Sequence, residues 1–208
     1  MKEIMKNAGI LFAITLIAGL LLGVVNDVTK EPIAKRAEED AKEAMSAVFT
    51  EDSEKGLPGA ESYKEMTFSA EKAASLLAIA ELEAESVDEI YEAYDASGNL
   101  LGYVFGMTSK EGYAGEISFT MGVRLDGTLN GICLTTINET IGLGMNAEEV
   151  LVPQFSGKKV SSFTYTKTGA VTDDQVDAIT SATYTTNAIV NGVNAGLYVF
   201  EHIGEVME

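Results

Sequence analysis

The sequence predicts an α+β protein in which one N-terminal transmembrane helix is followed by an extracytoplasmic domain with antiparallel β-hairpins and flanking helices. Three observations support this prediction. An uncharged apolar run fills residues 8–25, turn residues separate strand-like segments after residue 89, and a helical apolar pattern closes the chain. With 208 residues, the chain has room for one anchor and one domain with its own hydrophobic core.

The apolar run at residues 8–25 approaches the roughly 20 residues that cross a bilayer. A cleaved signal peptide is the alternative, but its apolar region usually spans about 7–15 residues and ends in small residues. Here two valines lead directly into Asn26. We therefore predict a retained transmembrane helix at residues 8–26, after a cytoplasmic tail at residues 1–7. Lysines lie on both sides of the span, so the positive-inside rule does not determine its orientation. We place the domain outside because long domains are translocated largely regardless of their charge.

The segment after the span reads as a helix and then as an acidic stretch. Small and apolar residues recur at helical spacing through residues 27–50, and Pro32 suits the first turn of such a helix. We predict a polar stalk helix there. An acid-rich variable segment follows at residues 51–88, with a second helix at residues 69–84.

Two β-hairpins are predicted from residue 89 onward. Residues 89–95 and 100–108 are rich in aromatic and β-branched side chains and flank a turn that contains Gly98. Residues 116–125 and 129–138 flank an Asp-Gly pair, which is the strongest short-range hairpin signal.

Two later segments each allow two interpretations. Gly142 and Gly144 interrupt the strand pattern, and glycine lets backbone approach another surface, so this segment is either a turn or a ligand-binding loop. The closing helix begins near Thr185 by its apolar spacing, and hydroxyl residues precede it. Such residues ordinarily cap the free N–H groups of a helix, so a plain cap is one interpretation of them.

Charge and composition exclude several classes of function. The formal charge of −18 repels nucleic-acid phosphates, so we expect no nucleic acid partner. Cys133 is the only cysteine, which excludes a disulfide, a zinc cluster or an iron–sulfur cluster built from this chain's own thiols. His202 is the only histidine and lies near the C-terminus, which argues against a histidine-based triad or a haem ligand. We expect neither catalytic residues nor metal ligands, and any electron carrier must be organic or belong to a neighbour.

The two ambiguous segments together resemble the FMN-binding domain that is shared by the Rnf complex (in its G subunit) and the sodium-translocating NADH:quinone reductase (in its C subunit). In that family, FMN is carried by a segment of the form Asp-x-x-Ser/Thr-Gly-Ala-Thr, and residues 177–183 here read DAITSAT. A Glu-Thr-Pro-Gly-Leu-Gly loop lies beside the flavin, and residues 139–144 here read ETIGLG. The stretch GYAGEI at residues 112–117 is also similar.

The resemblance covers residues 1–48 and 89–203, including VTKEPIAKRAEE after the span, and two residues depart from it. Ser181 stands where the family has glycine, so the acceptor loop must tolerate a Cβ if that position needs a positive φ. Ile141 stands where the family has proline, which loosens the loop but keeps both glycines. Residues 89–208 are therefore expected to be an FMN-binding domain.

The resemblance implies that a flavin transferase joins FMN, through its phosphate, to Thr183 as a phosphoester. The positive end of the last helix would offset the phosphate charge, and the flavin ring would lie against the two glycines. Asp177 would orient the loop or help attachment. The expected cofactor-binding residues are Thr183, Ala182, Ser181, Thr180, Asp177, Thr185, Thr186, Glu139, Thr140, Gly142, Leu143 and Gly144.

The resemblance further implies an electron-transfer component of a membrane-bound, ion-translocating ferredoxin:NAD⁺ oxidoreductase, with other membrane and peripheral Rnf subunits as partners. The chain has no nicotinamide-binding fingerprint and one span, so it would act only within such an assembly. Two alternatives remain. One is a stand-alone membrane-anchored flavin-binding sensor or extracellular electron-transfer module. The other is an anchored binding or structural protein in which the hydroxyls only cap a helix.

Overall fold

The computed structural model describes residues 2–51 and 57–207, and the chain forms two compact units, Met1–Ala41 and Lys42–Glu208. The first unit belongs to one long helix, α1 (Lys2–Val48). Pro32 lies inside α1 and not in the first turn of a separate stalk helix, because the span and the expected stalk form one continuous helix. In the described part of the chain, α1 is the helix long and apolar enough to cross a membrane, over Lys2–Ile33.

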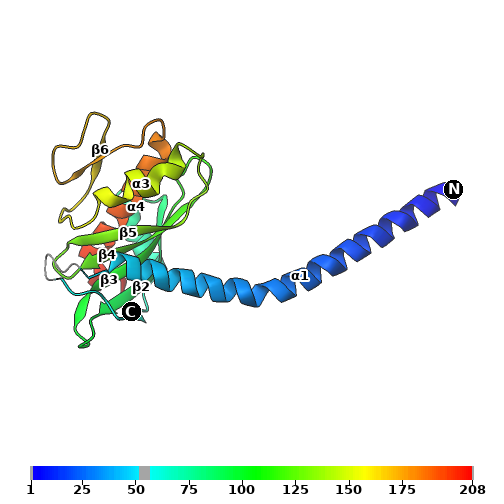
Figure 1. Cartoon of the computed structure of the whole chain (residues 1–208), viewed down its shortest axis with the longest axis horizontal. Helices are drawn as coiled ribbons and strands as arrows, with labels where there is room; N and C mark the ends of the chain where they lie inside the picture. Colours follow the sequence, from blue (N-terminus) through cyan, green and yellow to red (C-terminus); the bar gives the residue numbers. More distant parts are fainter. Residues whose placement is uncertain (1, 52–56, 208) are drawn as a thin grey trace. The chain divides into compact units, whose positions relative to one another are not determined.

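The second unit is built on an antiparallel sheet of five strands in chain order (Figure 1). Both predicted hairpins are confirmed, although the first of the predicted strands begins four residues before residue 89. The strands are β1 (Ser62–Glu65), β2 (Glu85–Tyr94), β3 (Leu100–Ser109), β4 (Ile117–Arg124) and β5 (Leu129–Thr136).

Local turn chemistry closes both hairpins. In the first, Asp95 Oδ1 accepts hydrogen bonds of 2.8 Å from the N–H groups of Ser97 and Asn99. In the second, Asp126 Oδ1 accepts from the N–H of Thr128 at 3.0 Å, and Gly127 adopts a φ of 86°. These side chains stabilise the turns that fix the strand register, as Asx-turn residues do.

Part of the segment expected to be acidic and variable belongs to the same sheet and its cover. β1 pairs with β2, and helix α2 (Ala70–Ile79) packs on β2. Ser69 caps this helix by accepting a 3.4 Å hydrogen bond from the N–H of Lys72. The described part of the segment therefore contains an edge strand, a covering helix and the start of β2. Glu65 and Glu71 face solvent, whereas Glu85 is buried.

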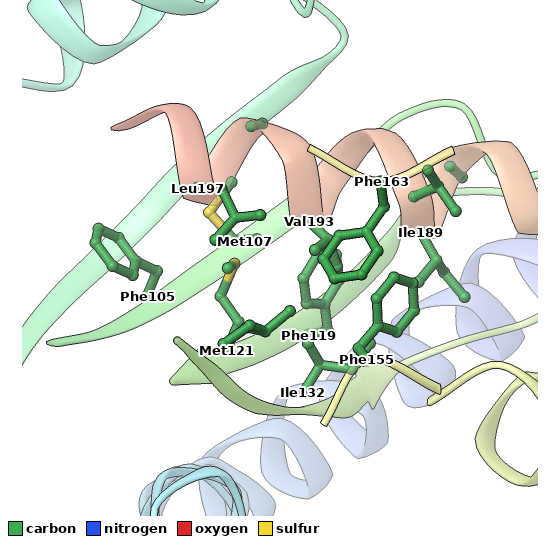
Figure 2. Close-up of a cluster of buried hydrophobic side chains, with 14 of the residues drawn as sticks. Phe105, Met107, Phe119, Met121, Ile132, Phe155, Phe163, Ile189, Val193 and Leu197 are labelled. Atoms are coloured by element: carbon green, nitrogen blue, oxygen red, sulfur yellow. The ribbon is translucent and has the colours of Figure 1, made fainter. Parts of the chain in front are cut away.

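Helix α4 (Thr183–Glu201) lies across one face of the sheet and supplies much of the core (Figure 2). Two glycines allow the close approach. A Cβ at Gly192 would lie 2.8 Å from the ring of Phe119, and one at Gly196 would collide with Met121. Figure 2 shows the apolar side chains that fill this layer, among them Phe105, Met107, Phe119, Met121, Ile132, Phe155, Phe163, Ile189, Val193 and Leu197.

The opposite face of the sheet is covered by the residues that end α1 and follow it. The ring of Phe49 lies where Gly102 and Gly122 leave room for it, and Arg124 stacks over that ring at 5.5 Å. Asn130 donates a 2.7 Å hydrogen bond to the carbonyl of Val48. Helix α4 and the end of α1 thus hold the sheet between two layers.

The chain between β5 and α4 forms short elements that were not predicted from the sequence. Two short strands, β6 (Thr164–Thr166) and β7 (Gln175–Asp177), pair in parallel. In the same part of the chain, the rings of Phe155 and Phe163 meet edge to face with their centroids 5.0 Å apart. The elements are η1 (Gly144–Asn146), α3 (Ala147–Val150), η2 (Val152–Gln154), β6 (Thr164–Thr166) and β7 (Gln175–Asp177), with α5 (Ile203–Val206) after α4.

Candidate functional site

A cavity of ≈ 450 Å³ opens where the glycine-containing loop after β5 meets the first turn of α4. Both segments that the sequence singled out therefore contribute to one pocket. Its volume is within the range of small-molecule and cofactor sites. The pocket is lined by Tyr113, Glu139, Thr140, Leu143, Gly144, Ser181, Ala182, Thr183, Tyr184 and Thr185.

Glu139 joins three segments of the chain at this pocket. Its side chain is 7% exposed, and Oε2 accepts a 3.0 Å hydrogen bond from the Thr185 hydroxyl. Oε1 accepts a 3.3 Å bond from the N–H of Ala114. Because both carboxylate oxygens already accept hydrogen bonds, Glu139 holds the loops together and is poorly placed to act as an acid or base.

Gly144 is required by packing around this carboxylate. A Cβ at Gly144 would lie 2.5 Å from Thr185 Oγ1 and 2.7 Å from Glu139 Cβ. The expected reason for a glycine here, room for a flat ring, therefore does not apply at Gly144. Gly142 instead has a φ of 78° and open space around it, so backbone conformation explains that glycine.

The first turn of α4 faces the pocket without a side-chain cap. The helix begins at Thr183, two residues before the predicted start, and its N-cap is Ala182. Within residues 2–51 and 57–207, no side chain accepts a hydrogen bond from the N–H groups of this first turn, in contrast to Ser69 at the start of α2. The plain-cap interpretation of the hydroxyl residues is therefore wrong. Free N–H groups and the helix dipole make this end suited to an anion.

Ser181 adopts the left-handed backbone conformation, with a φ of 61°. This is the position at which the resembled family has glycine, so a positive φ explains that preference. A non-glycine residue there costs about 1–2 kcal/mol of backbone strain. The Ser181 side chain is exposed and lines the pocket.

Thr186 holds the loop that precedes α4 through two hydrogen bonds. Its hydroxyl donates to the carbonyl of Ala182 at 2.9 Å and accepts from the N–H of Ile179 at 3.1 Å. Its side chain is fully buried. Thr180 is exposed and, like Thr186, lies outside the lining of the pocket.

Asp177 also lies outside the lining of the pocket, where it orders a neighbouring loop. Its Oδ1 accepts a 2.7 Å hydrogen bond from the N–H of Ala170. Its backbone N–H and carbonyl both bond the side-chain amide of Gln154, at 2.7 and 3.1 Å. Asp177 therefore orders the loop around Ala170, and its expected role at the loop before α4 stays a prediction.

Tyr113 and Tyr184 line the pocket, and the expected site residues did not include them. Each is 69% exposed, and their ring centroids are 6.2 Å apart. The sequence could have indicated Tyr184 as a site residue. It lies between two threonines at the start of the last helix, where the apolar pattern that marks core positions has not yet begun. Two exposed aromatic rings beside a cavity can stack on a planar ligand.

Two known protein families match parts of this chain. The chain matches the FMN-binding domain family over residues 112–198 and the RnfG N-terminal region family over residues 1–48. It is 30% identical to the G subunit of the Na⁺-translocating ferredoxin:NAD⁺ oxidoreductase complex of Acetobacterium woodii, over 98% of this chain and 95% of that one. It is 28% identical to the G subunit of the ion-translocating oxidoreductase complex of Methanosarcina acetivorans, over 94% of each chain.

The fold is similar to a solved structure, the C subunit of the Na⁺-translocating NADH-quinone reductase from Parabacteroides distasonis. That similarity has a TM-score of 0.53 and 19% identity, and covers 80% of this chain and 93% of the other. The sheet, the pocket at the start of α4 and the matched domain together define a protein of the FMN-binding-domain class. The chain belongs to the RnfG family, the G subunits of the ion-translocating oxidoreductase complexes of the Rnf type.

Proposed function

We propose that this chain is the electron-transfer subunit of a membrane-bound, ion-translocating ferredoxin:NAD⁺ oxidoreductase complex and carries FMN through a phosphoester at Thr183. The relatives in Acetobacterium woodii and Methanosarcina acetivorans are both G subunits of ion-translocating oxidoreductase complexes. The observation that supports the proposal most is the convergence of the 139–144 loop and the uncapped start of α4 on one cavity.

The residues of the pocket fit a phosphate ester at Thr183. Thr183 is the first residue of α4, half-buried, and its side chain lines the cavity. The free N–H groups of the same turn would hold the phosphate, and the helix dipole would offset its negative charge. The chain has a formal charge of −18, so this local compensation matters.

The hydroxyl groups around Thr183 divide into two sets. Thr185 and Thr186 are buried and already bonded to Glu139 and to the Ala182 carbonyl, so they position the loops. Thr180 and Ser181 are exposed, and Ser181 lines the cavity. Of the expected hydroxyl donors to the cofactor, Ser181 is therefore the one best placed.

Thr140, Leu143 and Tyr113 would form the wall against which the flavin ring lies. FMN supplies the redox chemistry when bound, since no side chain expected here exchanges electrons. The protein contributes position, electrostatics and partial exclusion of water. A covalent link also keeps the flavin from being lost where no free pool would replace it.

We further propose that α1 anchors the chain in the membrane, with residues 1–7 in the cytoplasm, the span at residues 8–26 and the FMN-binding domain outside. The anchor is supported by the length and apolar composition of Lys2–Ile33. Electron donors and acceptors would be the other membrane and peripheral subunits. A flavin transferase would attach the cofactor.

The test is the mass of the full chain produced together with a flavin transferase. We expect added mass equal to one esterified FMN, and in-gel fluorescence after denaturation. The modified tryptic peptide should contain Thr183. Wild-type protein of unaltered mass under these conditions would overturn the covalent assignment.

Thr183→Val should abolish the modification, because it removes the acceptor oxygen and keeps a branched side chain. Thr180→Val is the matched control, since Thr180 is an exposed hydroxyl three residues away. It should leave the modification in place. Covalent flavin retained in the Thr183 variant, or lost only in the Thr180 variant, would mean that another residue carries the ester.

A further inference from the structure

A second cluster of polar side chains lies behind the pocket, where β2 begins and β3 ends beside α4. It consists of two carboxyl groups, Glu85 and Glu111, together with Ser109, Asn187 and Asn191. Glu85 is 5% exposed although it is the first residue of a strand. Nothing in the proposed cofactor site uses this cluster.

Every neutral side chain of the cluster directs a hydrogen-bond donor at a carboxyl group. The Ser109 hydroxyl donates to Glu85 Oε1 at 3.1 Å. The side-chain amides of Asn187 and Asn191 both donate to Glu111 Oε2, at 3.1 and 2.6 Å. Glu111 thus has the surroundings of an ionised carboxylate.

Glu85 Oε2 is different, because it is buried and no donor group of the described residues directs a hydrogen bond at it. It lies against α4, 3.3 Å from the position that a Cβ of Gly192 would take. A buried ionised oxygen without a partner is strongly unfavourable, and a neighbouring negative charge makes it worse. A proton on this oxygen removes the charge and turns it into a donor.

Among the described residues, no positively charged side chain acts on Glu85 to replace that proton. Helix α4 has no charged side chain before Glu201, and α2 directs Ala73 and Leu77 inward. On the adjoining strand ends, Lys110 and Glu83 are exposed. Burial first, and the negative charge of Glu111 next, raise the pKa of Glu85 to about 8, although the hydrogen bond from Ser109 acts in the opposite direction.

We propose that Glu85 and Glu111 form a proton-binding site in which, at neutral pH, one proton resides on Glu85 Oε2 and is donated to the ionised Glu111. A metal ion suits this site less well, because the amide N–H and hydroxyl groups around it present hydrogens where a cation needs oxygen atoms. When the site opens, the proton leaves to solvent and Glu85 becomes a carboxylate.

Loss of this proton affects the rim of the cofactor pocket. Glu111 precedes Tyr113 by two residues, and the N–H of Ala114 bonds the pocket residue Glu139. Two adjacent carboxylates repel each other, so ionised Glu85 displaces Glu111 and loosens residues 110–115. The site thus makes the order of the rim depend on pH.

Infrared pH-difference spectroscopy of the full chain in a detergent without carbonyl groups tests the site. At pH 7 we expect one C=O band of a protonated carboxyl group that shifts to lower frequency when the protein contains ¹³C-glutamate. The band should disappear with a midpoint near the pKa given above and be absent at pH 7 in Glu85→Gln. Absence of any such band in the wild type at pH 7 would overturn the proposal.

Glu83→Gln is the matched control, because Glu83 is an exposed carboxylate two residues away. Its spectrum should keep the band, and loss of the band there would contradict the assignment to Glu85.

Glu85→Gln keeps a donor toward Glu111 and so mimics the protonated state. Hydrogen-exchange protection of residues 110–115, corrected for intrinsic rates, should fall several-fold above the midpoint in the wild type but not in Glu85→Gln. Equal protection on both sides of the midpoint would refute the link to the rim.

Discussion

The hydroxyl of Thr185 donates a 3.0 Å hydrogen bond to Glu139, which lies 46 positions earlier in the chain. Both side chains are buried. Thr185 belongs to the first turn of α4, and Glu139 opens the loop that forms the facing wall of the pocket. This one bond therefore ties the first turn of α4 to the glycine-containing loop.

Replacement of Thr185 by valine should destabilise the domain by about 1–3 kcal/mol, because it leaves a buried carboxylate oxygen without its donor. The loss should appear as a lower Tm of the full chain made without flavin. Thr183→Val is the matched control two residues earlier, at a half-buried position, and should change Tm much less. Equal shifts in the two variants would mean that the hydrogen bond contributes nothing measurable.

Replacement of Ser181 by glycine should stabilise the domain by about 1 kcal/mol, because glycine adopts the φ of 61° at Ser181 without strain. The Tm should rise by a few degrees. Flavin attachment should also proceed at least as fast, since the loop then has the residue of the resembled family. A lower Tm would show that the Ser181 side chain stabilises this loop.

Glu81→Gly provides an independent measure of how much glycine stabilises the domain at a residue with a positive φ. Glu81 follows the C-cap of α2 with a φ of 60°, and the N–H of Leu82 bonds the carbonyl of Leu77 at 2.8 Å in the manner of a glycine-ended helix. Glu81 does not line the pocket, so its substitution should raise Tm by a similar amount and leave flavin attachment unchanged.

The parts of the fold that depend on local chemistry were predictable from the sequence. Asp126 and Gly127 form the turn between β4 and β5, and Gly98 lies in the turn between β2 and β3. In these hairpins, residues close in sequence determine the conformation, so the pattern is readable without a partner. The apolar spacing of α4 is readable for the same reason.

Contacts between distant segments leave no comparable pattern in the sequence. Glu139 and Thr185 are joined only by the tertiary fold, and the same is true of β1, which becomes a strand because β2 offers it an edge. The start of α4 was placed at Thr185 because apolar spacing begins there, whereas the backbone turns helical at Thr183. The resemblance singled out two segments that the fold brings together at one cavity. The role of Gly144, however, depends on neighbours that only the folded chain brings together.

Replacement of Gly144 by alanine should disrupt the pocket, because its Cβ would lie 2.5 Å from Thr185 Oγ1 and 2.7 Å from Glu139 Cβ. Overpacking of this kind typically costs about 1–3 kcal/mol. We expect a lower Tm and reduced flavin attachment in cells that contain the transferase. Gly131→Ala is the control, since a Cβ there meets nothing within 4 Å. Unchanged attachment in Gly144→Ala would show that the Glu139 contact is dispensable.

Stability should fall as pH rises between about 4.5 and about 8, owing to Glu85. Burial raises the pKa of Glu85 from 4.5 to about 8 in the folded chain, so over this window the folded state binds a proton that the unfolded state has lost. Glu85 therefore contributes its full stabilisation below pH 4.5. This stabilisation is lost as pH rises through about 8, with a slope of at most about 1.4 kcal/mol per pH unit.

Unfolding of the full chain in detergent at several pH values measures the slope. Glu85→Gln should flatten it while Glu83→Gln should not, because only the first removes the buried titrating group. A slope that is the same in all three proteins would show that Glu85 titrates alike in the folded and unfolded chain.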